Sequence, residues 1–259
     1  MIQSVGRAAR VLRALGSAPG RLGVTELSER IGLPKATVYG LLRTLEAHQF
    51  VEQELETGKY RLGPALLQLG NAFLENHELR ARSLLWADSL AGRAGEAVHV
   101  GVLYGPSVLI VHHVFRPDNS VQILEVGASI PWHACALGKA IVAYLEPARR
   151  AELLGGPLPR LTGRSRTDPD ALAAELDQVA RDGVAVEAQE AIVGEGGVAA
   201  ALFDNQGAVV GAIGLAGPVE RLLPGDRPAA AAVAAVKEAA RGLSRELGAG
   251  RLAAPSVGA

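Results

Sequence analysis

The sequence has a single cysteine, Cys135, and almost no net charge: 26 Lys and Arg stand against 27 Asp and Glu, for a formal charge of −1. One cysteine excludes an intrachain disulfide and suits a reducing compartment, so we expect a cytoplasmic protein. The balanced charge excludes a chain that is attracted as a whole to nucleic acid, to membranes or to an acidic partner.

Long hydrophobic runs are absent as well. No apolar stretch approaches the ~18 residues that a membrane-spanning helix needs, and the N-terminus lacks the pattern of a secretory signal, so we expect no membrane partner. The segment SVGRAARVLRALGS (residues 4–17) is rich in arginine and free of acids, as mitochondrial transit peptides are. Its apolar residues keep a helical period that leads directly into the next periodic segment, which favours the first helix of a domain.

The length of 259 residues allows two domains with separate cores. The charge balance hides an asymmetry, because residues 1–50 hold seven bases and three acids, 7 − 3 = +4, in a chain whose total is −1. The bases are Arg7, Arg10, Arg13, Arg21, Arg30, Lys35 and Arg43, and the acids are Glu26, Glu29 and Glu46.

The segment GLPKATVYGLLRTL (residues 32–45) predicts a helix with two distinct faces. Its apolar residues have the i, i+3, i+4, i+7 spacing of a core-facing stripe: Val38, Leu41, Leu42 and Leu45. The opposite face holds small residues and one base: Ala36, Gly40, Arg43 and Ala47, with Thr37 and Tyr39 on its flanks. A merely solvated helix favours Lys, Glu and Gln there, and glycine costs ~1 kcal/mol relative to alanine. The small residues indicate that another molecule approaches this face.

The neighbouring segments complete a DNA-binding unit. Upstream, a short periodic segment ends at Gly32, which predicts a helix, a tight turn and a second helix. Downstream, FVEQELETGKYRLG (residues 50–63) predicts a hairpin, or wing, with Lys59 and Arg61 on one face. We predict that the small-residue face lies in a DNA major groove, with the wing beside a phosphate backbone. A protein-binding module remains an alternative, because the hairpin also carries three glutamates that would repel phosphate.

Four segments in this order resemble the IclR-type transcriptional regulators: SVGRAARVLRAL, VTELSERIGLPKATVYGLLRTLEAHQFVEQ, TGKYRLGPALLQLG and HACALGKAIVAYL. The resemblance extends from about residue 4 to residue 248. Within that family, HELRARSLLWADSLA, VLIVHHVFRPDNS and LEVGA are most similar to the glycerol-operon repressors of actinomycetes. The resemblance implies an α+β protein with an N-terminal winged helix-turn-helix domain, a helical linker and a C-terminal GAF-like α/β effector-binding domain.

The two-faced helix, the wing and the resemblance assign the DNA contacts. The candidate residues are Lys35, Ala36, Thr37, Tyr39, Gly40, Arg43, Lys59 and Arg61. We expect Arg43 and Lys35 to be the main contacts, with Thr37 and Tyr39 as their partners. Family members often have arginine at the position of Gly40, whereas the glycerol-type relatives resemble this chain in having glycine, which indicates an altered operator sequence.

Helical periodicity continues after the wing in two segments, which we expect to link the domains and to dimerise. Trp86 lies in the second segment, and a tryptophan at helical spacing more commonly anchors a core. We divide the chain into a DNA-binding domain (residues 1–63), a helical linker and dimerisation segment (64–93), an effector-binding domain (94–248) and a disordered tail (249–259).

The effector-binding domain alternates strand-like and helical runs. The predicted strands are EAVHVGVL, SVLIVHHV, VQILEV, GVAVEAQE, VAAALFD and AVVGAIGLA. The predicted helices are HACALGKAIVAYL, an alanine-rich C-terminal segment, and DPDALAAELDQVARDG, with Asp168 as N-cap, Pro169 in its first turn and Gly183 as terminator.

An enzyme is the first rival hypothesis. GEGGVA (residues 194–199) matches a dinucleotide fingerprint, but the crossover helix and the acid that the fingerprint requires do not follow it. His112 and His113 are neighbours in a strand and point to opposite faces, so they cannot share a metal ion. Cys135 has no evident base-orienting carboxylate and is better interpreted as a small buried thiol than as a nucleophile. We expect no cofactor, no metal and no enzymatic activity.

GASIPWHACALGKA (residues 127–140) places a loop before a helix N-terminus, which suits an anionic metabolite. The family resemblance implies the effector-binding residues His133, Ala136, Leu137, Glu187, Gly197, Gly214 and Ala216. Relatives that bind small keto acids have hydroxyl or thiol groups at several of these positions, whereas this chain has glycine and alanine. The resemblance therefore favours glycerol 3-phosphate or glycerol as effector. His133 and Glu187 are equally interpretable as residues that satisfy buried polar groups.

We predict a homodimeric or tetrameric DNA-binding regulator, a repressor of glycerol catabolism that binds a double-stranded operator and responds to a small-molecule effector. A regulator of another catabolic pathway with a carboxylate or aromatic effector remains an alternative, as does a metabolic enzyme.

Overall fold

A computed structural model describes residues 2–118 and 125–250 of the chain. The chain forms two compact units, residues 1–76 and residues 77–259, and each is described by itself. Part of the predicted strand VQILEV and residues 251–259 of the predicted tail lie outside the described residues. Across the described ranges, no helix has the length and apolar character required to cross a membrane.

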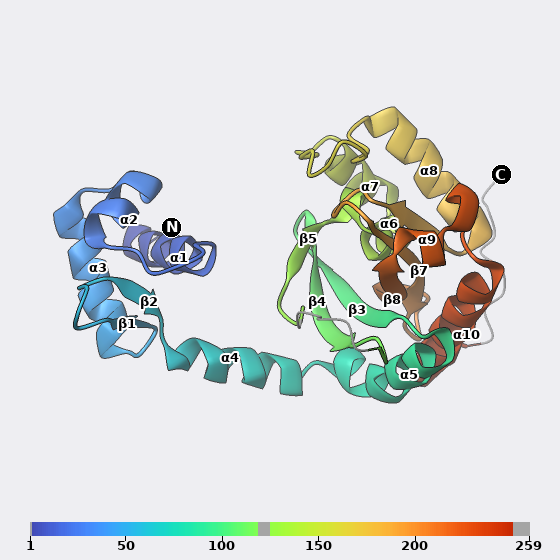
Figure 1. Cartoon of the computed structure of the whole chain (residues 1–259), viewed down its shortest axis with the longest axis horizontal. Coiled ribbons are helices and arrows are strands. Elements are labelled where there is room, and N and C mark those ends of the chain that lie inside the picture. The colour runs from blue at the N-terminus through green and yellow to red at the C-terminus, as the bar shows by residue number, and fades with distance from the viewer. Residues whose placement is uncertain (1, 119–124, 251–259) are drawn as a thin grey trace. The chain divides into compact units, whose positions relative to one another are not determined.

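The first unit is a helix-turn-helix followed by a hairpin (Figure 1). Its elements are α1 (Gln3–Gly16), α2 (Val24–Ile31), α3 (Lys35–Ala47), β1 (Val51–Gln53), β2 (Tyr60–Leu62) and α4 (Pro64–Glu75). Gly32 ends α2 in the left-handed conformation, with φ of +63°, which glycine adopts without steric cost. This turn lets α3 start three residues later, as the sequence predicts.

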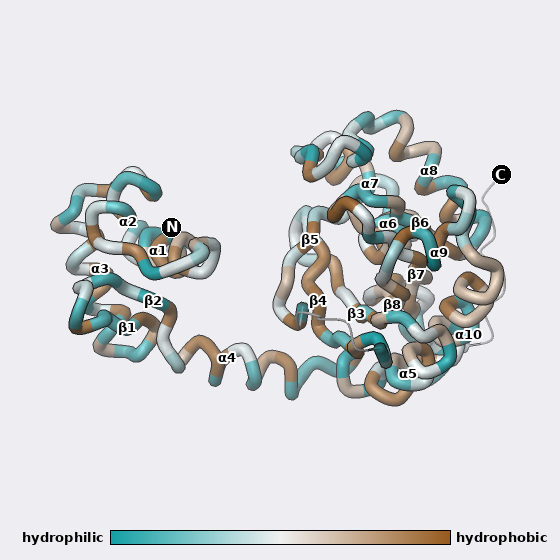
Figure 2. Tube along the Cα trace, in the orientation of Figure 1, coloured by the Kyte–Doolittle hydropathy of each residue, from teal (hydrophilic) through white to brown (hydrophobic). Residues whose placement is uncertain are grey.

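The core of the first unit is formed by one face of each helix and by the hairpin. The fully buried side chains are Val11, Leu27, Val38, Leu42, Val51 and Tyr60. The hairpin pairs Val51 with Leu62 and Gln53 with Tyr60. It is therefore fixed against the helices as a wing. By contrast, α4 buries none of its residues, and Figure 2 shows hydrophobic residues along it.

The second unit is built on a six-stranded antiparallel sheet with the order β5-β4-β3-β8-β7-β6. The strands are β3 (Ala97–Tyr104), β4 (Ser107–Val114), β5 (Ser129–Pro131), β6 (Ala185–Ala188), β7 (Glu195–Phe203) and β8 (Val209–Pro218). The helices are α5 (Glu78–Ala94), η1 (Trp132–Ala134), α6 (Ala136–Val142), α7 (Pro147–Leu154), α8 (Pro169–Asp182), α9 (Val219–Leu222), η2 (Pro224–Asp226) and α10 (Ala230–Glu246).

Helices cover both faces of the sheet (Figure 1). On β8, Gly211 faces Leu79 of α5, whereas its neighbour Ala212 belongs to the core around α6. Because successive strand residues point to opposite faces, α5 and α10 lie on one face and α6 on the other. Asp168 caps α8 through its side chain and Gly183 ends the helix, which confirms both predicted boundaries.

The segment predicted as a linker, residues 64–93, falls in both units. Its first helix, α4, belongs to the first unit, and its second helix, α5, packs against α10 and the sheet of the second. Ala249, at the start of the predicted disordered tail, is buried and donates its N–H to the carbonyl of Ser244. That residue is part of the folded unit because it closes the end of α10.

The contact between α5 and α10 predicts a stability change. A Cβ at Gly242 of α10 would overlap the indole ring of Trp86, whereas a Cβ at Gly92 of α5 would meet no atom within 4 Å. We expect Gly242→Ala to lower the free energy of unfolding by ~1–3 kcal/mol through overpacking. The matched control Gly92→Ala should raise it by up to ~1 kcal/mol, because alanine favours a helix. Thermal unfolding of both variants measures this, and equal effects would contradict the packing of Trp86 on Gly242.

Candidate DNA-binding face and effector pocket

The exposed face of α3 is the first candidate site. Ala36, Gly40, Arg43 and Lys35 are exposed, and the Tyr39 side chain remains 53% exposed although it is large and aromatic. A Cβ at Gly40 would meet no atom within 4 Å, so this part of the helix surface is open. The face is therefore low and accessible, as insertion into a major groove requires.

Three of the basic candidate side chains, Arg43, Lys59 and Arg61, form ion pairs with acids. Arg43 lies 2.9 Å from Glu46 on its own helix. On the wing, Lys59 lies 3.1 Å from Glu26 of α2, and Arg61 lies 2.7 Å from Glu52 of the opposite strand. These pairs are exposed, and exposed ion pairs contribute little to stability. They can exchange the carboxylate for a phosphate at a small cost.

The second candidate site is a cavity of about 290 Å³ in the second unit. It lies where the first turn of α6 meets small residues of β7 and β8. Six of the seven predicted effector-binding residues line it: Ala136, Leu137, Glu187, Gly197, Gly214 and Ala216. Strand pairing places Gly197 opposite both Glu187 and Ala216, which explains why residues far apart in sequence meet here.

His133, the seventh predicted residue, lies outside this cavity. It is fully buried, and its Nε2 lies 3.0 Å from the carbonyl oxygen of Pro159. Burial lowers its pKa, so it is neutral and donates this bond. Cys135 lines the cavity as a buried thiol whose pKa burial raises to about 12. Its Sγ caps α6 by accepting the N–H of Gly138. A thiol with such a raised pKa is a poor nucleophile at neutral pH.

Glu187 is the predicted residue with the most perturbed chemistry. Its Oε1 accepts the backbone N–H groups of Glu190 and Ala191. Burial is the largest influence on its carboxyl group and raises the pKa to about 7, although the two N–H donors oppose the rise. Near neutral pH this carboxyl group is able to donate or accept a hydrogen bond in the pocket.

The pocket is also lined by polar residues that were not predicted from the sequence to bind the effector. The additional polar lining residues are His99, His113, Arg116, Glu125 and Glu195. Burial lowers the pKa of His99 to about 3, so the ring is uncharged, and burial also raises the pKa of Glu125. His113 stacks edge-on against His99, and its Nδ1 accepts the N–H of Glu125. Strand alternation signals that one of His112 and His113 faces this side, but which one does so depends on the sheet register.

The metal hypothesis finds no geometry to support it. Among the residues that the structure describes, no group of three His, Cys, Asp or Glu side chains is placed to hold a metal ion. GEGGVA, the other enzyme-like motif, ends the β6–β7 loop and enters strand β7, where a dinucleotide site needs a helix.

Comparison with known proteins decides the family. Residues 4–55 match the IclR helix-turn-helix domain, and residues 71–245 match the bacterial transcriptional regulator IclR C-terminal domain. The chain belongs to the IclR family.

Individual relatives of this IclR protein cover nearly its whole length. It is 48% identical to the "Glycerol operon regulatory protein" of Streptomyces griseus and 46% identical to the protein of the same name from Streptomyces coelicolor; each match covers 96% of this chain and 98% of the relative. The crystal structure of an IclR transcriptional regulator from Alicyclobacillus acidocaldarius is similar with a TM-score of 0.81 at 29% identity, over 96% of this chain and 100% of that one.

Membership of the IclR family establishes a DNA-binding transcriptional regulator, not an enzyme, whose partners are DNA and an effector ligand. The predicted α+β fold, with an N-terminal helix-turn-helix and a C-terminal domain of mixed helices and strands, is confirmed. The individual DNA and effector contacts stay predictions, supported by the exposed face of α3 and by the lining of the pocket.

The DNA-binding face generates a prediction for Arg43. We expect Arg43→Ala to weaken operator binding by ~1–3 kcal/mol if the side chain reads a guanine. If the side chain holds a phosphate, we expect the slope of log affinity against log salt concentration to become shallower by ~1. Arg93→Ala, which removes an exposed ion pair with Glu238 in the other unit, is the matched control. Fluorescence anisotropy over a range of salt concentrations measures both quantities. Unchanged affinity and slope in Arg43→Ala would remove this side chain from the interface.

The carboxyl group of Glu187 generates a pH prediction. The unfolded chain loses this proton near 4.5 and the folded protein near 7, so the folded state binds more protons in between. The stabilising contribution of the protonated Glu187 carboxyl group is therefore fully present below pH 4.5 and is lost as the pH rises to 7. We expect Glu187→Gln to remove a decline of up to ~3 kcal/mol in the free energy of unfolding over this range. Denaturant titrations of both proteins at pH 4.5 and 7.5 test it, and equal pH slopes would contradict the raised pKa.

Proposed function

We propose that this regulator represses genes of glycerol catabolism in the cytoplasm and releases its operator when glycerol or glycerol 3-phosphate occupies the pocket beside α6. The observation that carries the proposal is the similarity, over nearly the whole chain, to two proteins named for the glycerol operon, together with a small pocket lined by six of the seven implied effector residues.

The size and chemistry of the pocket support a small hydroxylated effector. Its volume of about 290 Å³ is just below the ~300–1,000 Å³ typical of ligand sites. Glu125, Glu187 and Glu195 offer oxygen atoms to hydroxyl groups, which glycerol and its phosphate both have. Arg116 is the only Lys or Arg among the described lining residues, and a phosphate group would require it.

The proposed regulator acts as a homodimer on a pseudo-palindromic operator, because a two-fold protein reads two equivalent half-sites. A tetramer composed of two such dimers is compatible with this arrangement. The side chains of Leu67 and Leu69 on α4 are 68% and 57% exposed, and such apolar surface is typical of a segment that pairs with another copy. The effector acts by binding the DNA-free form more tightly than the DNA-bound form.

A thermal-shift and DNA-binding experiment tests this function. We expect glycerol or glycerol 3-phosphate to stabilise the protein by ~2.7 kcal/mol at a concentration of one hundred times Kd and to release promoter DNA. Gly197→Val should abolish both effects but retain DNA binding, because even a Cβ there lies 3.3 Å from Ala136 and 3.7 Å from Glu187 Oε2. Arg116→Gln should weaken the binding of glycerol 3-phosphate but not that of glycerol.

Pyruvate and 4-hydroxybenzoate serve as comparison ligands in the same assay. If either of these acids stabilises the protein and neither glycerol nor its phosphate does, the protein regulates another catabolic pathway and the glycerol assignment is wrong. Absence of any salt-dependent shift of promoter DNA would contradict the proposed operator.

A further inference from the structure

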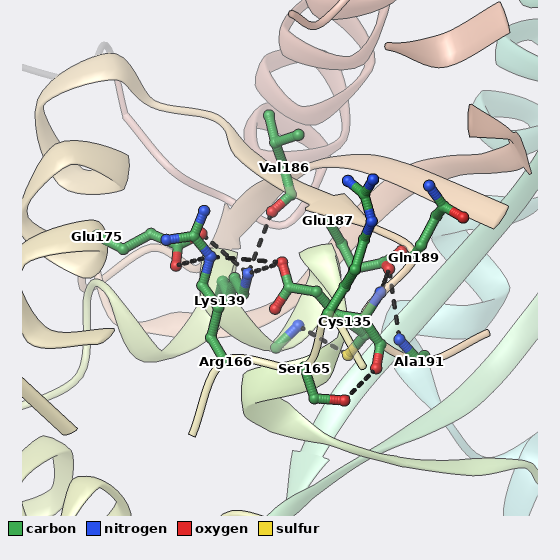
Figure 3. Close-up of polar contacts among 12 residues, drawn as sticks. Cys135, Lys139, Ser165, Arg166, Glu175, Val186, Glu187, Gln189 and Ala191 are labelled. Atoms are coloured by element: carbon green, nitrogen blue, oxygen red, sulfur yellow. Dashed lines mark hydrogen bonds and ion pairs between the residues drawn. The ribbon is translucent and has the colours of Figure 1, made fainter. Parts of the chain in front are cut away.

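A fully buried lysine lies directly behind the effector pocket. Lys139, on α6, has an exposed fraction of 0%, and its Nζ donates to Glu190 Oε1 at 2.6 Å, to Glu175 Oε1 at 2.9 Å and to the carbonyl oxygen of Val186 at 3.4 Å (Figure 3). All three ammonium protons therefore have acceptors. A buried ammonium group without such partners would cost several kcal/mol.

The cluster around Lys139 balances its charges. Two glutamates, Glu175 and Glu190, face Lys139 and the exposed side chain of Arg166, whose Nε lies 3.4 Å from Glu175 and 3.8 Å from Glu190. Replacing a buried ion pair by apolar groups of similar size is often neutral or stabilising. Stability by itself is therefore a weak reason for this cluster, and its position calls for a functional one.

Glu190 connects the cluster to the wall of the pocket. It lies in the loop between β6 and β7, and the next two residues, Ala191 and Ile192, line the pocket. Two hydroxyl groups hold the loop as well, because Thr162 Oγ1 and Ser165 Oγ donate to its carbonyl oxygens at 2.6 and 2.7 Å. The ion pair with Lys139 is the contact that joins this loop to α6.

The same loop orients Glu187. Its backbone N–H groups at Glu190 and Ala191 hold Oε1 (Figure 3). Oε2 lies 3.7 Å from the position that a Cβ on Gly197 would occupy, and both residues line the pocket. The charged or titratable groups that act on Glu187 are Lys139 of α6, the neutral thiol of Cys135 and Glu190 of the loop.

We propose that Lys139 is a positioning residue for effector recognition, an inference that rests on the effector-binding function proposed above. Through its ion pair with Glu190 it fixes the β6–β7 loop, and the amide groups of that loop hold the Glu187 carboxyl group so that Oε2 meets the effector. The cluster thereby sets the shape of one pocket wall without touching the ligand.

A double variant separates this role from a purely structural one. Lys139→Met alone leaves Glu190 buried without its cation and should destabilise the protein. Lys139→Met combined with Glu190→Gln removes both charges of the pair and roughly keeps the side-chain sizes, so we expect it to be more stable than Lys139→Met alone. If the pair only balances buried charge, recognition returns as well. If it positions the loop, glycerol affinity stays lower by about tenfold.

Two measurements on the double variant decide between these outcomes. Calorimetric titration with glycerol and with glycerol 3-phosphate gives the affinity, and amide hydrogen exchange by NMR reports on the N–H groups of Glu190 and Ala191. We expect exchange of these two amides to accelerate by about tenfold while the sheet amides stay protected. Arg166→Gln is the control, since it leaves the bond between Lys139 and Glu190 intact and should behave as the unmodified protein.

The exchange measurement uses the ligand-free protein, so it decides the inference even if neither compound binds. Failure of both ligands to bind the unmodified protein would remove the effector assignment only. A double variant with unmodified amide exchange and, where measurable, affinity would overturn the positioning role of Lys139.

Discussion

The tight packing of α6 against β7 and β8 is the contact on which the second unit depends. Every residue of α6 is buried, and the strands beneath it present glycine and alanine at Gly197, Ala199, Gly214 and Ala216. Small residues let the helix approach the sheet closely, and at its first turn they leave a space that no side chain fills. Both the packed core and the candidate effector pocket thus follow from the small side chains along these two strands.

The first unit has small side chains on its surface as well. The α3 helix directs Val38, Leu42 and Leu45 inward and leaves alanine and glycine outside, which lowers helix propensity but allows close approach of a duplex. The predicted binding face and the core-facing stripe are therefore two consequences of one helical pattern. The pocket and this face lie in separate units, so regulation requires the effector to bind the free and DNA-bound forms with different affinities.

Local patterns in the sequence predict much of the fold. The turn at Gly32, the wing and the limits of α8 depend on neighbouring residues, so spacing and capping rules reach them. The pocket is harder, because its members come from strands whose register is not local. Pairing of His99 with Gly214 and of Glu187 with Gly197 brings in side chains that no single segment identifies. Lys139 gives no signal at all, since its partners Glu175 and Glu190 follow 36 and 51 residues later.

The acids that hold Arg43, Lys59 and Arg61, three of the predicted DNA contacts, would affect how such a regulator finds its target. Cations that already face carboxylates attract random chromosomal DNA weakly, because non-specific binding depends on unpaired positive charge near phosphates. Fewer regulator molecules are then bound to the large excess of non-specific DNA, and more of them are free to bind the promoter. In the predicted DNA interface, these ion pairs would therefore lower non-specific affinity and favour discrimination between the operator and other DNA.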